Sequence, residues 1–299
     1  MNYKVTFLTQ TYLSIEAPSE QVALELFRAG HPASGDPLGI TPAGDDAPDA
    51  NLQASPPTLG REPARAALHL AVCQNRFELL DQLLDAHGLP IDTYFGSTPL
   101  HTATRRGYVA CMEVLLKRKA DPNLLDGQCM TCLMTAATRG DLEATAMLLE
   151  HGANPNIASP NGSTALMFAA LKRAPKVMGL LIEHGADPEV SDERGWTPLH
   201  CVVGEVVGVP PADNSEQVSC TRLLIKPLAR VDVPNHNGQT PLHFAALCGE
   251  QCAAVVDLLL EAGADPTRKD KSGYTPIERA IRGGFVDLAL RMHARRETE

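Results

Sequence analysis

Apolar positions along residues 66–299 recur in pairs of short runs, each about two or three helical turns long. The second run of a pair carries adjacent aliphatic residues, as in Met147-Leu148-Leu149 and Leu258-Leu259-Leu260. A glycine and then a proline follow it, as in Gly152-Ala153-Asn154-Pro155. Glycine adopts the left-handed conformation that ends a helix, and proline cannot continue one. The pattern predicts two helices per unit, and because one unit cannot bury its own apolar face, the units must stack.

The first run of each pair begins with a four-residue motif, Thr-Pro-Leu-His. Threonine is a good N-cap, and proline is well tolerated at the first helical position. The histidine can bond the threonine hydroxyl or a neighbouring backbone carbonyl. Small pairs such as Ala136-Ala137 let successive first helices pack closely. Complete copies start at Thr98, Thr197 and Thr240, and weaker copies start at Ala66, Thr131, Thr164 and Thr275.

Successive copies lie 32, 33, 33, 33, 43 and 35 residues apart. This period, together with the Thr-Pro-Leu-His motif, resembles the ankyrin repeat. The resemblance covers residues 65–299 and implies an all-α repeat solenoid of about seven ankyrin-like helix–turn–helix repeats. The repeats are expected near residues 66–97, 98–130, 131–163, 164–196, 197–239, 240–274 and 275–299.

Several repeats depart from the pattern. The first lacks the Thr-Pro pair and resembles an N-terminal cap, and Lys119 of the second replaces a glycine at a cost of roughly 1 kcal/mol if left-handed. In the fifth, Val202-Val203 replaces the small pair and should shift the helix packing. About nine extra residues lie around 208–215, either as a binding loop or as a tolerated insertion. The polar residues 291–297 suit a C-terminal cap.

Two further segments precede the repeats. Residues 4–16 alternate in part between apolar and polar and predict one long strand or two short ones, and Ser19 begins a predicted helix that ends at Gly30. This strand–helix element, residues 1–30, is too small to fold alone, so it docks on the first repeat, pairs with another copy, or binds a partner's sheet edge. Residues 31–64 are rich in proline and glycine and predict a disordered linker.

The composition narrows the class of protein. Of the 299 residues 44% are hydrophobic, 21% charged and 4% aromatic, and the net charge of −10 argues against nonspecific binding to nucleic acid. The chain has no run of 18 apolar residues and no signal-peptide core, so neither membrane insertion nor secretion is expected. Eight scattered cysteines favour a reduced compartment, which predicts a cytoplasmic protein. The oligomeric state stays open.

The sequence offers few candidate catalytic residues. Cys129 and Cys132 have the CxxC spacing. A zinc site needs four ligands, however, and the sequence has no second CxxC, so we interpret the two cysteines as sequence variation at positions of the repeat motif. The histidines recur at one repeat position, which indicates local bonding rather than a general base. No nucleophile elbow, phosphate-binding loop or metalloprotease motif is present. We expect no catalytic, cofactor-binding or metal-binding residues, and no enzyme.

The resemblance implies protein–protein recognition through the concave side and the turn tips of the array. Such a protein would be a scaffold, adaptor or stoichiometric inhibitor; the alternative is a translocated effector or immunity-type protein. Basic residues at one place on successive first helices predict a stripe for an acidic partner surface, unless they form only a solvated face. Residues at the turn tips would add apolar contacts with the partner, unless their aromatic rings fold back over the turns. The candidates are Arg105, Arg106, Arg139, Lys172 and Arg173 in the stripe, and Tyr94, Phe95, Arg194, Trp196 and Tyr274 at the tips.

Overall fold

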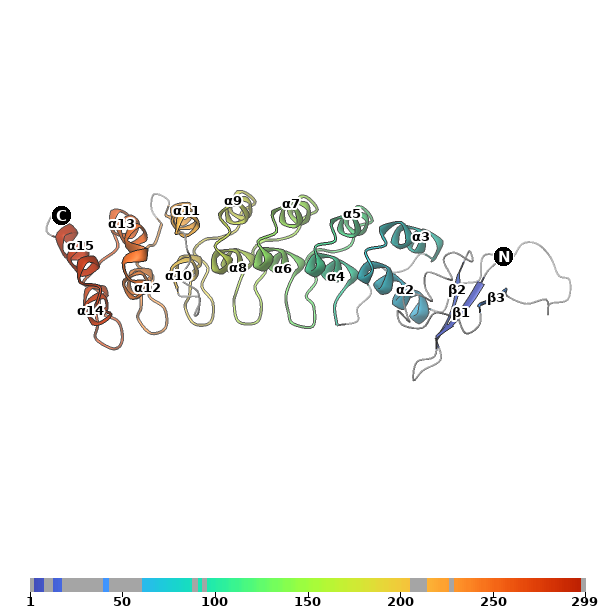
Figure 1. Ribbon diagram of the computed structural model, residues 1–299, viewed down its shortest axis with the longest axis horizontal. Coiled ribbons are helices and arrows are strands. Elements are labelled where there is room, and N and C mark those ends of the chain that lie inside the picture. Colours follow the sequence, from blue (N-terminus) through green and yellow to red (C-terminus); the bar gives the residue numbers. More distant parts are fainter. Residues whose placement is uncertain are drawn as a thin grey trace. The chain divides into compact units, whose positions relative to one another are not determined.

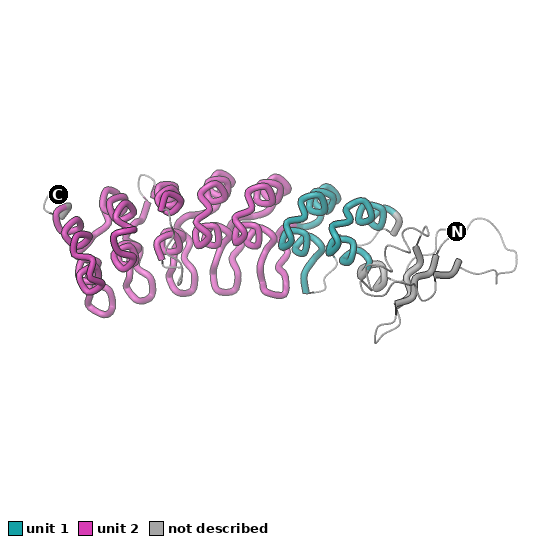
Figure 2. Tube along the Cα trace, in the orientation of Figure 1, with its two compact units in different colours: residues 1–121 teal, residues 122–299 magenta. Residues whose placement is uncertain are grey.

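The protein is described here by a computed structural model. The structure describes residues 3–7, 13–17, 40–42, 61–87, 91–92, 96–204, 214–225 and 229–296. The chain divides into two compact units, residues 1–121 and residues 122–299 (Figure 2). The boundary falls inside the predicted array, within its second repeat (98–130), and each unit is considered by itself.

The first unit begins with a three-stranded antiparallel sheet of order β2-β1-β3. Strand β1 (Tyr3–Phe7) pairs with β2 (Leu13–Ala17), so of the two alternatives the two short strands are the ones that form. Strand β3 (Ile40–Pro42) pairs with the other edge of β1 and was not predicted, because it lies within the supposed linker. Ile and Thr are β-branched, and the proline closes the strand at the sheet edge. The predicted helix after Ser19 and most of residues 31–64 lie outside the described residues.

Four helices complete the first unit. Helix α2 (Arg61–Cys73) starts before the expected domain boundary and packs on α3 (Phe77–His87), and α4 (Pro99–Arg106) packs on α5 (Val109–Lys117). Thr98 caps α4 by accepting the backbone N–H of His101. The core between the two helix pairs contains buried leucine, methionine and alanine side chains.

The second unit repeats this helix pair five times (Figure 1). First helices stack on first helices and second helices on second helices, in two layers. The layer of first helices contains α6 (Cys132–Arg139), α8 (Ala165–Lys172), α10 (Pro198–Val203), α12 (Pro241–Cys248) and α14 (Pro276–Arg282). The other contains α7 (Leu142–Glu150), α9 (Pro175–Glu183), α11 (Ser215–Leu224), α13 (Ala253–Glu261), preceded by the 3₁₀ turn η1 (Glu250–Cys252), and α15 (Val286–Arg296).

The local predictions about turns are confirmed. Lys119 has φ 69°, in the left-handed region that Gly152, with φ 86°, occupies in the next repeat. Cys129, at the place of a turn glycine, has φ 56°. The small pair Ala136-Ala137 is fully buried between successive first helices. At these turns the chain reverses direction over a few residues. The left-handed conformation therefore depends on local sequence, which is why it can be predicted.

The last repeat differs from the predicted polar cap. Helix α15 buries Leu288 and Met292, but Ile281, Val286 and Leu290 are 54%, 56% and 61% exposed. Ile281 stands where the preceding repeat has Ala246, which is fully buried. Among the described residues, no further helix pair follows α14 and α15 to cover this side chain.

The fifth repeat is the irregular one. Helix α10 has six residues, where α6 and α8 have eight. Val202 and Val203 are fully buried, but the helix ends at Gly204 with φ −58° and one capping bond, to the carbonyl of His200. By comparison, Gly140 ends α6 in the left-handed region, and its N–H reaches two carbonyls. Repeat five therefore has a weaker helix end than repeat three.

We expect α10 and α11 to exchange their amide hydrogens faster than α6, α7, α8 and α9. The reason is the short, singly capped helix α10, whose opening costs less free energy than opening of its neighbours. Hydrogen exchange followed by mass spectrometry measures this directly. Equal protection of all these helices would contradict the prediction.

Candidate partner-binding surface

The turn tips of the second unit are built around a recurring buried carboxylate or amide. One side-chain oxygen of Asp192 accepts the backbone N–H groups of Arg194 (2.9 Å) and Trp196 (2.8 Å). Asp126, Asn235 and Asp270 each accept two backbone N–H groups in the same way. This set was missed in the sequence, although its spacing follows the repeat period and Asp and Asn favour such turns.

Neighbouring tips are tied by backbone hydrogen bonds. The N–H of Glu193 donates to the carbonyl of Asn161, that of His236 to Arg194, and that of Lys271 to Asn237, each at 2.9 Å. Each bond joins one repeat to the next. The four turn tips from Asn161 to Lys271 therefore form one bonded edge rather than separate loops.

The motif histidines bond their threonine hydroxyls, as the sequence predicts, and also bond a backbone carbonyl in the following turn tip. The Nδ1 of His200 accepts the backbone N–H of Thr197 (3.2 Å) and lies 2.9 Å from its hydroxyl, while Nε2 donates to the carbonyl of Gln239 (3.1 Å). His243 bonds Thr240 and Tyr274 in the same way. Burial lowers the pKa of His200 to about 4 and also lowers the pKa of His243. These imidazoles are neutral structural links between repeats at pH 7.

Four of the five predicted stripe residues are exposed at the C-terminal ends of first helices. Arg105 and Arg106 end α4 in the first unit. In the second unit Arg139 ends α6, 4.0 Å from Asp141, and Lys172 ends α8. The stem of Lys172 covers the end of α6, because a Cβ added at Gly140 would lie 3.4 Å from its Cγ. Lys172 therefore lies beside Gly140, the residue that follows Arg139.

Arg173 lies apart from Lys172. It ends α8 in the left-handed region with φ 56°, is half-buried, and its Nε has no hydrogen-bond partner. Burial raises the pKa of the Cys220 thiol to about 12, and the charge of Arg173 opposes this rise. Arg173 is therefore less exposed than the other four residues, although its backbone holds the position that the register predicts.

The tip aromatics pack back onto the array. Trp196 is half-buried, with its ring centroid 4.9 Å from that of Phe244 on α12. Arg194 lies 5.1 Å over the same ring and also pairs with Asp192. Tyr274 lies 4.3 Å under the guanidinium of Arg282. The remaining candidates, Tyr94 and Phe95, lie outside the described residues.

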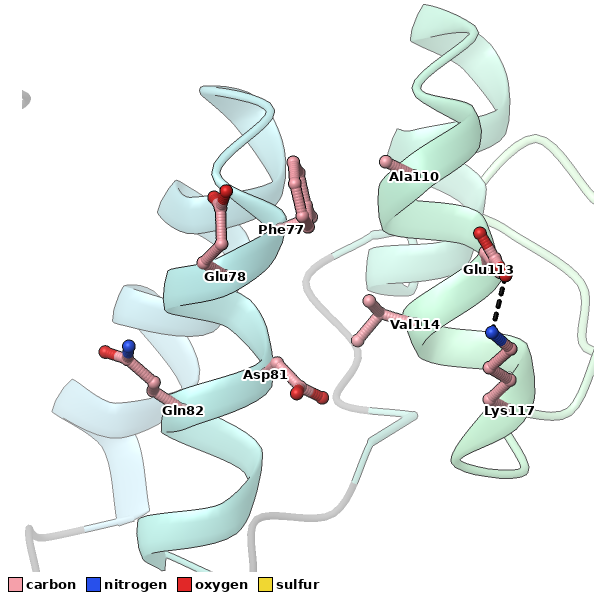
Figure 3. Close-up of a pocket in the computed structure, with 8 residues that line it drawn as sticks. All are labelled: Phe77, Glu78, Asp81, Gln82, Ala110, Glu113, Val114 and Lys117. Carbon is pink, nitrogen blue, oxygen red and sulfur yellow. Dashed lines mark hydrogen bonds and ion pairs between the residues drawn. The ribbon is translucent and has the colours of Figure 1, made fainter.

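The first unit carries a groove on its second helices, between α3 and α5 (Figure 3). Apolar side chains of Phe77, Ala110 and Val114 line it together with polar ones. Lys117 pairs with Glu113 across one helical turn. The groove is separate from the first helices that carry Arg105 and Arg106.

Within the described ranges, no group of three or more His, Cys, Asp or Glu side chains is arranged to hold a metal ion. Over the same part of the chain, no helix combines the length and apolar character needed to cross a bilayer. All eight cysteines are free thiols.

Stacked helix pairs, joined by bonded turn tips and linked by motif histidines, define the class of helical repeat proteins. The chain belongs to the ankyrin repeat family. The family model described as ankyrin repeats (3 copies) matches residues 48–126, 133–207 and 212–292, and the model described as ankyrin repeats (many copies) matches residues 106–149.

Relatives share these repeats. The ankyrin repeat protein YahD of Escherichia coli (strain K12) is 40% identical over 87 residues, which cover 28% of this chain and 43% of that protein. Palmitoyltransferase ZDHHC13 of Mus musculus is 34% identical over 246 residues, which cover 79% of this chain and 32% of that protein. The chain thus spans less than half the length of each. The crystal structure of the ankyrin repeat domain of Bcl-3 matches with a TM-score of 0.62 and 27% identity, over 75% of this chain and 97% of that chain.

Proposed function

We propose that the protein is a non-catalytic recognition module, a scaffold, adaptor or stoichiometric inhibitor that binds an acidic surface of another protein. The observation that carries the proposal is the position of the cations: in a chain of net charge −10, Arg106, Arg139 and Lys172 are exposed at equivalent ends of first helices. Exposed like charges attract a partner's carboxylates and accelerate association. The guanidinium groups can also grip a carboxylate with two hydrogen bonds.

The thiols support a reducing compartment, and we place the protein in the cytoplasm. Burial raises the pKa of Cys111 to about 11 and that of Cys201 to about 12. Such thiols stay protonated at neutral pH and react slowly. Disulfides are rare in reducing compartments, so eight free thiols suit such an environment.

The triple variant Arg106→Glu, Arg139→Glu, Lys172→Glu should reduce the association rate with the partner protein by about tenfold or more at low salt. The parent's rate should fall with added salt, and the variant's should not. Stopped-flow or surface plasmon resonance measurements at two ionic strengths check both effects. Circular dichroism verifies the fold.

A matched control reverses three other exposed basic residues, Lys119, Lys176 and Arg222, which lie on second helices or the turns after them. It changes the net charge by the same amount, so it should retain most of the parental rate. If the triple variant and the control associate equally fast, the cations on the first helices are only a solvated face.

A further inference from the structure

We propose that the first helices and turn tips of the second unit bind an extended peptide segment with an apolar centre and acidic residues on both sides. This rests on the proposed function and adds the pattern that the partner segment must carry. The binding surface runs over α6, α8, α10, α12 and α14 and excludes Arg105 and Arg106 of the first unit.

The apolar centre begins with two residue pairs that repeat. Phe168 and Leu171 lie on α8, four and seven residues after the motif threonine, and Phe244 and Leu247 hold the same places on α12. Residues three apart share one face of a helix. Leu171 and Leu247 are 39% and 43% exposed, which is large for aliphatic side chains in the middle of an array.

Trp196 fills the place between these pairs. Repeat five has Gly204 where its neighbours have Leu171 and Leu247, and a Cβ added there would lie 2.6 Å from the Trp196 ring. The indole therefore lies over the end of α10 and reaches Phe244 of α12. These residues form an apolar strip over repeats four to six, in which Trp196 contacts Phe244; its members are Phe168, Leu171, Trp196, Phe244 and Leu247.

Cations flank the strip on both sides. Arg139 and Lys172 lie on the side of repeats three and four. On the other side, Lys271 in the turn before α14 and Arg282 at the end of α14 are exposed. Among the described residues of these first helices and tips, the exposed carboxylates are Glu193 and Glu278, and Glu278 accepts the N–H of Thr275. An acidic protein thus has a mostly basic face here, which complements a ligand with carboxylates at both ends.

The spacing sets the length of the segment. Packed helices lie 8–10 Å apart, so repeats four to six span about 20 Å and repeats three to seven about 40 Å. An extended chain advances about 3.3–3.6 Å per residue. The apolar centre then needs about six residues, and the whole segment about twelve.

Single-stranded nucleic acid is the rival ligand, because it too combines negative charge with groups that stack on aromatic rings. The strip is poorly suited to it. Arg194 covers Trp196, whose ring also packs on Phe244, and the exposed members Leu171 and Leu247 are aliphatic. Aliphatic side chains suit apolar side chains of a peptide better than stacked bases.

The test selects binders of the full chain from a displayed library of random 12-residue peptides. We expect enrichment of peptides with an apolar centre and Asp or Glu on both sides. Fluorescence anisotropy of a labelled selected peptide should show a loss of affinity of about tenfold for Leu247→Ser and for Leu171→Ser. Reversal of Lys172 or Arg282 to Glu should also weaken binding.

Leu142→Ser is the matched control, because Leu142 is 41% exposed but belongs to the second helix α7. It should bind the peptide within about twofold of the parent. Equal binding by Leu247→Ser and Leu142→Ser, enrichment of peptides without acidic flanks, or displacement of the peptide by a random 12-base single-stranded DNA would overturn the inference. The association rates of the charge-reversed variants do not depend on these outcomes. The proposed function is therefore tested independently of the peptide-binding surface.

Discussion

Asp270→Ala is expected to destabilise the last repeat by about 3 kcal/mol. The Asp270 side chain is fully buried, accepts the N–H groups of Ser272 and Tyr274, and pairs with Arg279. Burial would raise the pKa of this carboxyl, but the Arg279 and backbone hydrogen bonds hold the pKa below its usual range. Removing one partner of a buried ion pair leaves the other uncompensated, which costs about 3–5 kcal/mol. Because Arg279 is one-fifth exposed, we expect the lower end of that range.

Urea unfolding measures the loss, and hydrogen exchange in α14 and α15 locates it. Asp270→Asn is the matched variant, since Asn235 serves the same turn role in the preceding repeat. It keeps the acceptor for the turn but leaves Arg279 without its carboxylate, so it should lose about 1 kcal/mol less than Asp270→Ala. Equal losses for Ala and Asn would show that the ion pair, and not the turn, provides the stability.

Acidification from pH 7 to pH 5 is expected to cost about 2 kcal/mol of stability through His200 alone. Burial lowers the pKa of His200 to about 4 in the folded protein, while an unfolded histidine titrates near 6.5. Between these two values the unfolded chain binds a proton that the folded chain does not. The free energy of unfolding therefore falls as the pH falls through 6.5, and the loss is complete below about pH 4.

The variant His200→Gln removes this titration and should flatten the dependence of unfolding free energy on pH between 7 and 5. It is also less stable at pH 7, because Gln cannot reproduce both ring bonds, so the slope is the informative quantity. His236→Gln, at an exposed histidine on a neighbouring tip, should keep the parental slope. Urea unfolding at pH 7, 6 and 5 provides the comparison. A parental slope in His200→Gln would contradict the assignment.

Part of the candidate surface follows from the repeat register. Arg106, Arg139 and Lys172 end their first helices as that register predicts, because a helix places residues of one register position on one side. The side chain of Arg173 cannot be predicted this way. It follows a left-handed turn at the end of α8, where the register of the helix no longer fixes the direction of the side chain.

The sequence alone determined the features that depend on a few neighbouring residues. Threonine caps, the left-handed Lys119 and the paired helices follow from short-range hydrogen bonding and backbone sterics, and the repeat period then requires stacking. Only the tertiary structure decided which side chains meet across repeats. Trp196 reaches Phe244, 48 residues later, because Gly204 leaves room beneath the indole. Such contacts depend on shape and free space between helices, which local propensity and periodicity do not encode.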